Sequence, residues 1–175
     1  SKTYTGTTNS TTVSAGASSG ATIDWYAASS GGPSLVSNSL TFAPTGVNAG
    51  SYTVYAEARN TSSGCVSAAR TPVTLTINKA AITITANAQS KTYGTVQSTP
   101  VTGSTAYTIT SGSLQNGETI GSVTLTYGAG ALPANAAVGS TSVITPSAAT
   151  GGTFTASNYT IAYATGIETV TRAAI

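Results

Sequence analysis

The sequence predicts an all-β protein made of two tandem β-sandwich-like modules, and three observations support this prediction. Apolar and polar residues alternate with a period of two along much of the chain, as they do in half-buried strands. The alternating segments are rich in Thr, Val, Ile and Tyr and are bounded by Gly, Asn, Pro or Ser, which favour turns. A short pattern from the middle of the chain recurs at its end, which indicates consecutive modules.

Nine segments show the alternation expected of strands: 22–27, 51–59, 72–78, 81–88, 106–110, 122–127, 140–145, 158–164 and 167–171. In "TLTIN" and "ITIT" the alternation places the threonines toward water and four apolar side chains inward: Leu75, Ile77, Ile82 and Ile84. Two apolar sheet faces must cover each other, so we expect sandwiches rather than flat sheets. The Ala-rich segment 128–139 is interrupted by Gly and Pro, and we expect a long connection there, with a short helical turn as the less favoured alternative.

The first half of the chain has the features of one sandwich. Trp25 lies in an early strand, and Tyr52 follows Asn48 at the spacing of the tyrosine corner of immunoglobulin-like sandwiches. In antibody domains a disulfide cysteine follows that tyrosine by two residues. Val54 occupies this position, and Val13 stands where the partner cysteine would lie. We therefore expect structural roles for Trp25 and Tyr52, with aliphatic side chains around Trp25 in place of a cross-sheet disulfide.

Three segments, "DWYAASSGG" (24–32), "YTVYAEAR" (52–59) and "GCVSAARTPV" (64–73), together resemble a bacterial immunoglobulin-like family frequent in large surface proteins of Bacteroidetes. The resemblance covers about residues 7–78. Relatives often carry a second cysteine near the first strand, and none stands there in this chain. We expect Cys65 to be a buried or half-buried free thiol.

The repeated pattern is "TINKAAI" (76–82), which aligns with "TVTRAAI" (169–175) at a separation of 93 residues. Each copy ends a strand, contains one basic residue, passes through Ala-Ala and reaches an isoleucine. A fixed offset of this kind is typical of tandem arrays. We expect one domain at 1–78, a second at 79–173, and the start of a further module at 174–175.

The second half resembles the bacterial repeat domain called MBG, through "AITITANAQSKTYG" (81–94) and "SNYTIAYATGIETVTRA" (157–173). Members of that family occur in long arrays within secreted or surface-anchored adhesin-like proteins, often beside immunoglobulin-like modules. Neither resemblance implies a catalytic residue. In "SKTYG" we expect a structural turn, with Gly94 in a conformation closed to other residues, Tyr93 packed near a sheet edge and Lys91 in solvent.

The composition excludes several classes of function. Charged residues make up 6% of the chain, against about 25% in ordinary domains, and the bases form no cluster that could bind nucleic acid. No stretch approaches the length of a membrane span. There is no histidine, and one cysteine cannot form a thiolate zinc site, so we expect no metal and no cofactor. A hydrated, uncharged Ser/Thr surface suits an extracellular protein, although drift in a low-complexity repeat is an equal alternative.

Catalysis would depend on paired carboxylates, and each half of the chain holds two acids: Asp24 with Glu57, and Glu118 with Glu168. Sequence spacing does not show that either pair converges, and we expect no enzyme. The junction "INKAAI" has no carboxylate for calcium. A spontaneous lysine crosslink would need a buried lysine beside a carboxyl group, and Lys91 with Glu118 is the least unfavourable pair.

Exposed aromatic rings could bind sugar by stacking. Trp25 and Tyr26 point to opposite faces of their strand, so Tyr26 is the candidate glycan contact. Tyr159, Ile161 and Tyr163 share a face that resembles a core more than a sugar platform.

These observations leave three hypotheses. The first is a pair of structural spacer modules from the stalk of a large secreted or cell-surface bacterial adhesin. Its partners would be neighbouring modules of the same chain, and extracellular glycans or other surface ligands would bind through other domains, without nucleic acid or membrane insertion. The alternatives are a carbohydrate-binding module of a secreted protein and a self-assembling extracellular fibre subunit.

Overall fold

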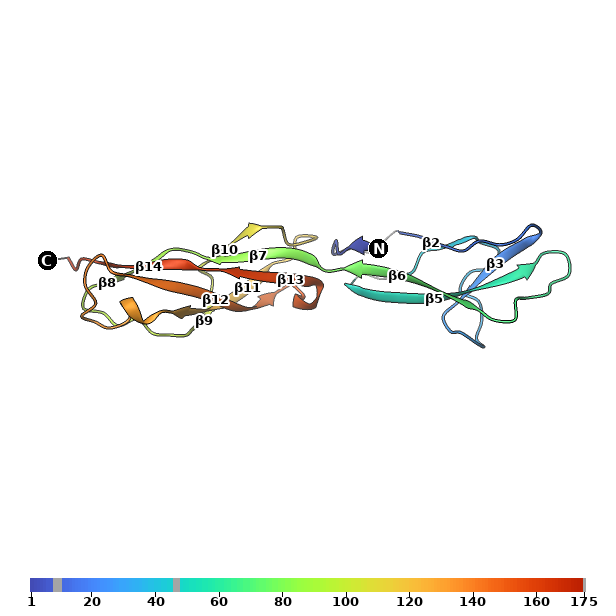
Figure 1. The fold of residues 1–175 in the computed structure, drawn as a ribbon. Helices are drawn as coiled ribbons and strands as arrows, with labels where there is room; N and C mark the ends of the chain where they lie inside the picture. The colour runs from blue at the N-terminus through green and yellow to red at the C-terminus, as the bar shows by residue number, and fades with distance from the viewer. Residues whose placement is uncertain (8–10, 46–47, 175) are drawn as a thin grey trace. The chain divides into compact units, whose positions relative to one another are not determined.

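The computed structural model describes residues 1–7, 11–45 and 48–174, and this part of the chain is all-β, as predicted (Figure 1). It forms two compact units, Ser1–Lys79 and Ala80–Ile175, which we call the first and second domains. The helical structure among the described residues is limited to two 3-10 turns, η1 (Ala129–Ala131) and η2 (Ala156–Asn158).

The first domain contains a four-stranded sheet in the order β1-β6-β5-β3. These strands are β1 (Lys2–Thr3), β3 (Ala21–Tyr26), β5 (Gly50–Asn60) and β6 (Thr71–Asn78). The long strand β5 pairs antiparallel with β3 and β6, whereas β1 runs parallel to β6. A two-stranded sheet of β2 (Val13–Ser14) and β4 (Thr41–Phe42) forms the second layer.

The core of the first domain is built around Trp25, whose side chain is fully buried. Ile23, Val54 and Ala56 are buried with it, and Val13 packs against the same cluster. The Phe42 ring stacks on Trp25 at 5.8 Å between centroids, and the indole N–H donates to the Ser39 carbonyl at 2.8 Å. Val13 and Val54 thus fill the two positions where a disulfide would stand, as the sequence predicts.

The hydrogen bond that characterises the predicted tyrosine corner is present. The Tyr52 hydroxyl donates to the Asn48 carbonyl oxygen, four residues earlier, at 2.8 Å. Such a bond fixes the turn that leads into a strand crossing between sheets. Tyr52 therefore positions the start of β5, the strand that carries the charged residues described below.

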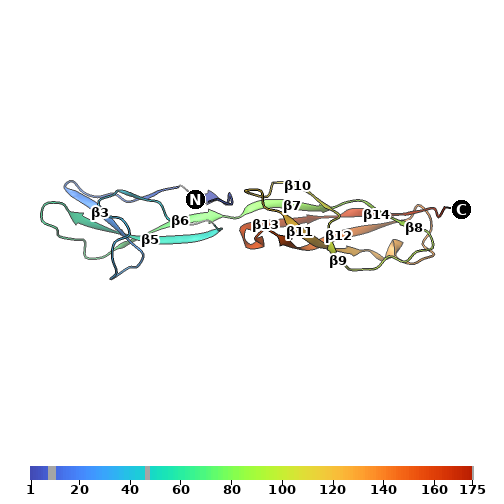
Figure 2. The same ribbon diagram turned by 180° about the vertical axis from the view of Figure 1, so that it is seen from behind.

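The second domain contains two sheets, in the orders β10-β7-β13 and β8-β14-β12-β11-β9. Their strands are β7 (Ala80–Ala86), β8 (Gln89–Thr92), β9 (Val101–Ser104), β10 (Tyr107–Ser111), β11 (Ile120–Tyr127), β12 (Thr141–Gly152), β13 (Tyr159–Ala164) and β14 (Gly166–Thr171). β11 and β12 form an antiparallel hairpin, whereas β13 runs parallel to β7 and β14 runs parallel to β8. Figure 2 shows the same arrangement from behind.

The inward alternation predicted for β6 and β7 is confirmed, because Leu75, Ile77, Ile82 and Ile84 are all buried. The shared core face predicted for β13 is only partly correct. Tyr159 is buried, Ile161 is half-buried and Tyr163 is 38% exposed. β13 is an edge strand of its sheet, so its later residues leave the core, and the Tyr163 hydroxyl instead accepts a hydrogen bond from the Ala149 N–H at 2.9 Å.

Three further expectations are corrected. The "SKTYG" segment is not a turn throughout, because residues 89–92 form β8 and only Tyr93-Gly94 turn, with Gly94 at φ +90°. Lys91 is buried rather than solvated, since strand pairing with β14 turns its side chain inward. Cys65 is exposed rather than buried, because it lies in the surface connection between β5 and β6. Segment 128–139 is a connection as expected, and it includes η1, the short helical turn that was the less favoured alternative.

Candidate functional site

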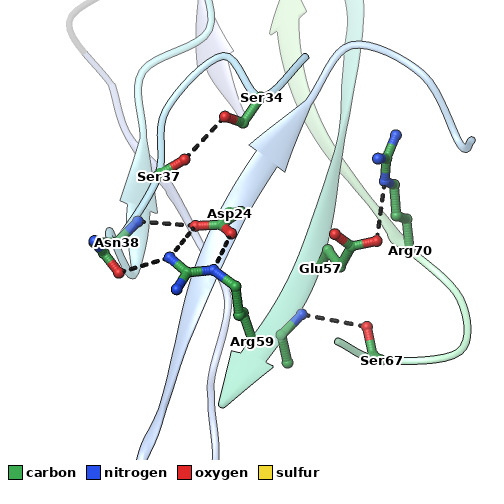
Figure 3. Close-up of polar contacts among 9 residues, drawn as sticks. Asp24, Ser34, Ser37, Asn38, Glu57, Arg59, Ser67 and Arg70 are labelled. Atoms are coloured by element: carbon green, nitrogen blue, oxygen red, sulfur yellow. Dashed lines mark hydrogen bonds and ion pairs between the residues drawn. The ribbon is translucent and has the colours of Figure 1, made fainter. Parts of the chain in front are cut away.

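A cluster of charged and polar side chains in the first domain lies on the outward face of β3 and β5 (Figure 3). Strand alternation turns Ile23 and Trp25 into the core, so Asp24 and Tyr26 project to the opposite side. Antiparallel pairing places Glu57 directly across from Asp24, and Arg59 across from Thr22. Two acids and the bases that neutralise them are thereby gathered on one sheet face.

Asp24 and Arg59 form the first ion pair of this cluster. Arg59 donates from Nε to Asp24 Oδ2 at 2.6 Å and from Nη2 to Oδ1 at 3.2 Å. The Asn38 backbone N–H donates to Oδ1 at 3.0 Å, and Arg59 also donates to the Asn38 side-chain oxygen at 2.9 Å. The hydrogen bonds from Arg59, above all, hold the pKa of Asp24 below its ordinary value, against the opposing effect of burial.

Glu57 and Arg70 form the second pair, with Arg70 Nε donating to Glu57 Oε1 at 3.3 Å. The Arg70 guanidinium lies over the Tyr26 ring at 3.3 Å from its centroid. It also donates to the carbonyl oxygens of Ala28 and Gly31, at 3.0 and 2.6 Å. Burial, followed by the hydrogen bond with Glu57, raises the pKa of the Tyr26 hydroxyl.

This arrangement can stabilise structure but is poorly suited to acid–base chemistry. A general acid needs a carboxyl group that stays protonated near neutral pH, and the Asp24 pKa is shifted the other way. Both carboxylates are engaged by arginines, and both arginines also contact the 27–38 connection after β3. The cluster therefore holds that connection against the sheet.

A second group of ionisable side chains is buried in the second domain. Lys91 in β8 and Glu168 in β14 are 4% and 1% exposed. Lys91 Nζ donates to the carbonyl oxygens of Thr95 and Pro133, at 2.7 and 2.9 Å, and Glu168 Oε2 has no hydrogen-bond partner among the described residues. Burial raises the pKa of Glu168, and nearby Lys91 partly opposes this rise. Burial, followed by the charge of Glu168, also raises the pKa of Tyr127.

The acid pair considered for the second domain does not come together. Glu118 accepts a hydrogen bond from the Tyr159 hydroxyl at 2.5 Å, at the start of β13, whereas Glu168 lies in β14. The lysine crosslink considered for Lys91 with Glu118 also lacks its geometry, because the acid near Lys91 is Glu168. The pairing of β8 with β14 explains why Glu168, and not Glu118, is the acid near Lys91. Lys91 lies across from Val170, and Glu168 is two residues before Val170 on the same face of β14.

No described group of three or more His, Cys, Asp or Glu side chains could hold a metal ion. Two hollows lie in the first domain, with volumes of about 320 and 400 Å³. Their linings are mainly small or apolar residues, such as Ala56 and Val73 in one and Leu35 and Phe42 in the other, without a charged side chain. Neither hollow has the convergent polar groups that fix a ligand's orientation.

Tyr26, the candidate glycan contact, already has the Arg70 guanidinium on its ring, so that face is occupied. Tyr93 is 46% exposed beside the Gly94 turn, and its N–H donates to the Thr171 carbonyl at 2.8 Å. Trp25 and Tyr52 take structural positions in the first domain, as described above. The glycan contact predicted at Tyr26 stays a prediction, and so do the structural roles predicted for Trp25, Tyr52, Tyr93 and Gly94.

Sequence reasoning missed the arginine partners and the buried Lys91–Glu168 pair. Arg59 could have been found, because it is two residues from Glu57 on an alternating strand and shares its face. The burial of Glu168 could not have been predicted. In "GIETV" the apolar Ile167 would be expected to point inward and its neighbour Glu168 outward, whereas Ile167 is 46% exposed and Glu168 is buried.

The fold defines the class of this protein. It consists of two all-β domains in tandem, and the first is an immunoglobulin-like sandwich. Comparison with family models identifies both. Residues 1–78 match the "Ig-like domain CHU_C associated" family, and residues 82–169 match the "MBG domain (YGX type)" family. The chain therefore belongs to the MBG family through its second domain and carries a CHU_C-associated immunoglobulin-like domain before it.

Residues 93–95 read Tyr-Gly-Thr, a sequence of the YGX form, within the matched range. The chain matches no curated protein and no solved structure. Domains of these two classes are typically non-catalytic and occur in extracellular surface proteins. In the described part of the chain, no helix is long and apolar enough to cross a bilayer.

Proposed function

We propose that the two domains are non-catalytic spacer modules in the stalk of a large secreted or cell-surface bacterial adhesin. The observation that carries the proposal is the tandem of an immunoglobulin-like domain and an MBG domain, both of which are consistent with extracellular repeat modules. In this function each domain adds length, resists proteolysis and holds a terminal binding domain away from the cell.

The polar clusters support a structural role. Asp24, Glu57 and their arginines bind one another and the neighbouring connection instead of presenting open charges. Few ionisable groups also make the surface insensitive to salt, because screening acts only on charge. Such a surface suits a spacer that works in variable surroundings.

Small-angle X-ray scattering of the 175-residue chain tests the proposal. A compact particle of this length has a radius of gyration of about 16 Å, and a spacer is expected to give a clearly larger value. The scattering of an equimolar mixture of the two separate domains is the reference. A value of about 16 Å that does not change with concentration would contradict the spacer role.

A glycan array provides a second test, because a carbohydrate-binding module would present an accessible aromatic platform. We expect no binding, since the Arg70 guanidinium occupies one face of the Tyr26 ring. Glycan binding that disappears in Tyr26→Ala but persists in Tyr93→Ala would overturn the spacer proposal. Concentration-dependent filaments in electron micrographs would instead favour a fibre subunit.

A further inference from the structure

The first and last segments of the second domain lie side by side and run in the same direction (Figures 1 and 2). Residues Ala80–Thr85 of β7 pair with Tyr159–Ala164 of β13, and Gln89–Thr92 of β8 pair with Glu168–Thr171 of β14. β7 and β13 belong to one sheet, and β8 and β14 to the other, so both segments change sheets together. We call these paired segments, 80–92 and 159–171, the terminal ribbon.

The two segments stay in contact where they change sheets. Gly166 lies so close to the other segment that a Cβ there would overlap the carbonyl oxygen of Ala86. At the far end, the Thr171 carbonyl accepts from the Tyr93 N–H at 2.8 Å, and the Thr171 hydroxyl donates to the Lys91 carbonyl at 3.3 Å. The terminal ribbon therefore has contacts at its start, its crossover and its end.

One face of the terminal ribbon is packed into the domain core. Ile82, Ile84, Tyr159 and Val170 are buried on it, and so are the ionisable side chains of Lys91 and Glu168. Water has little access to this face, so it cannot readily replace inter-strand hydrogen bonds as they open. Separation of the strands would also expose these two ionisable groups and the apolar side chains together.

The direction of the strands determines how the terminal ribbon responds to tension. The chain enters the domain at Ala80 and leaves it after Thr171, at opposite ends of the ribbon. Tension between these points pulls two parallel strands past each other, so the hydrogen bonds between them are loaded together. In the antiparallel pair of β7 and β10, Ser111 lies across from Thr83, so tension applied at that end opens one pair at a time.

We propose that the terminal ribbon is the force-bearing element of the second domain, which resists tension along the chain by shear. This inference rests on the proposed function, because a spacer in a stalk is pulled from its two ends. Beyond the spacer function, it assigns to the second domain the resistance to tension, through the parallel pairing of its first and last segments.

Single-molecule force spectroscopy with two attachment geometries tests the proposal. Both chains carry Cys65→Ser, so that the exposed native thiol does not react. One is pulled through Lys79→Cys and Arg172→Cys, the other through Lys79→Cys and Ser113→Cys, and all three attachment residues are exposed. The first geometry loads the terminal ribbon in shear, and the second peels β10 from β7. Equal thermal midpoints of the two chains ensure that only the direction of force differs.

We expect a rupture force at least about twofold higher through 79 and 172 than through 79 and 113 at the same pulling speed, because forced unfolding follows the unfolding rate along the loaded direction. An equal or lower force through 79 and 172 would overturn the proposal. That result would leave the spacer function standing, because solution scattering tests it separately. A compact particle in scattering together with a strong ribbon would overturn the spacer function alone.

Discussion

Arg70 connects three parts of the first domain through one guanidinium group. It pairs with Glu57 on β5, lies over the Tyr26 ring on β3, and donates to carbonyl oxygens at Ala28 and Gly31. Only the planar, multiply donating guanidinium can make all of these contacts from one position, whereas a lysine offers a single compact charge. Most of the side chain is shielded from water, so these contacts have little competition from solvent.

Replacement of this residue tests its structural role. We expect Arg70→Ala to lower the free energy of unfolding of the first domain by about 2 kcal/mol, because it leaves Glu57 and two carbonyl oxygens without their charged donor. Arg70→Lys keeps the charge and should cause a smaller loss. The measurement is urea unfolding followed by fluorescence of Trp25, the single tryptophan of the chain. Arg172→Ala in the second domain is the control, and a transition of Arg70→Ala at the wild-type urea concentration would refute the role.

At the scale of elements, the crossover of the terminal ribbon depends on one glycine. Gly166 is the first residue of β14 and is buried against the backbone at Ala86. Position 166 requires glycine because a Cβ atom there would overlap the backbone of Ala86. Position 139 leaves open space for a Cβ atom, but its φ of +86° favours glycine. These are different physical constraints, and substitution by alanine separates them.

We expect Gly166→Ala to destabilise the second domain by about 2–3 kcal/mol, because the added methyl group must push the paired segments apart. Gly139→Ala should cost only about 1 kcal/mol, since it adds backbone strain without a clash. Urea unfolding followed by amide NMR resonances of the second domain measures both. Chemical-shift changes in Gly166→Ala should centre on residues 86–87, and an unfolding midpoint equal to that of Gly139→Ala would argue against the close contact.

For the whole molecule, the two domains contain buried acids with opposite pKa shifts. The Asp24 pKa lies below its ordinary value of 3.8, so its contribution to stability is present above that pH and is lost as the pH falls through the folded-state pKa. The Glu168 pKa lies above its ordinary value of 4.5. Its contribution is therefore fullest below pH 4.5 and is lost as the pH rises through the folded-state pKa.

Two variants separate these contributions. The loss of stability caused by Asp24→Asn in the first domain should shrink as the pH falls from about 6 to about 3. The stability of Glu168→Gln relative to wild type, in the second domain, should increase as the pH rises from about 4 to about 8. Urea unfolding at each pH, followed by Trp25 fluorescence and by amide resonances of the second domain, measures them. A pH-independent difference in either variant would contradict the corresponding shift.

Long alternating segments allowed most of the fold to be predicted. All nine predicted strands overlap strands of the structure, from β3 to β14. Five strands were not predicted: β1, β2, β4, β8 and β9. They have two to four residues each, which is too short for a period of two to be recognised, and their pairing with distant segments determines them. The surroundings of Tyr26 and Lys91 could not be predicted from the sequence. Arg70 lies over Tyr26, and Glu168 lies near Lys91, only because distant strands pair in the folded sheets.

Local alternation and motifs within short stretches are sufficient to predict the all-β class, the two families and the core around Trp25. The remaining features depend on pairing between distant segments of the folded chain. The tertiary structure buried Lys91 and Glu168, exposed Ile167 and Cys65, and joined the first and last segments of the second domain in parallel. The physical reason is that the inward face of a strand is set by the strands with which it pairs, and in β14 this pairing prevails over the apolar pattern of its own residues.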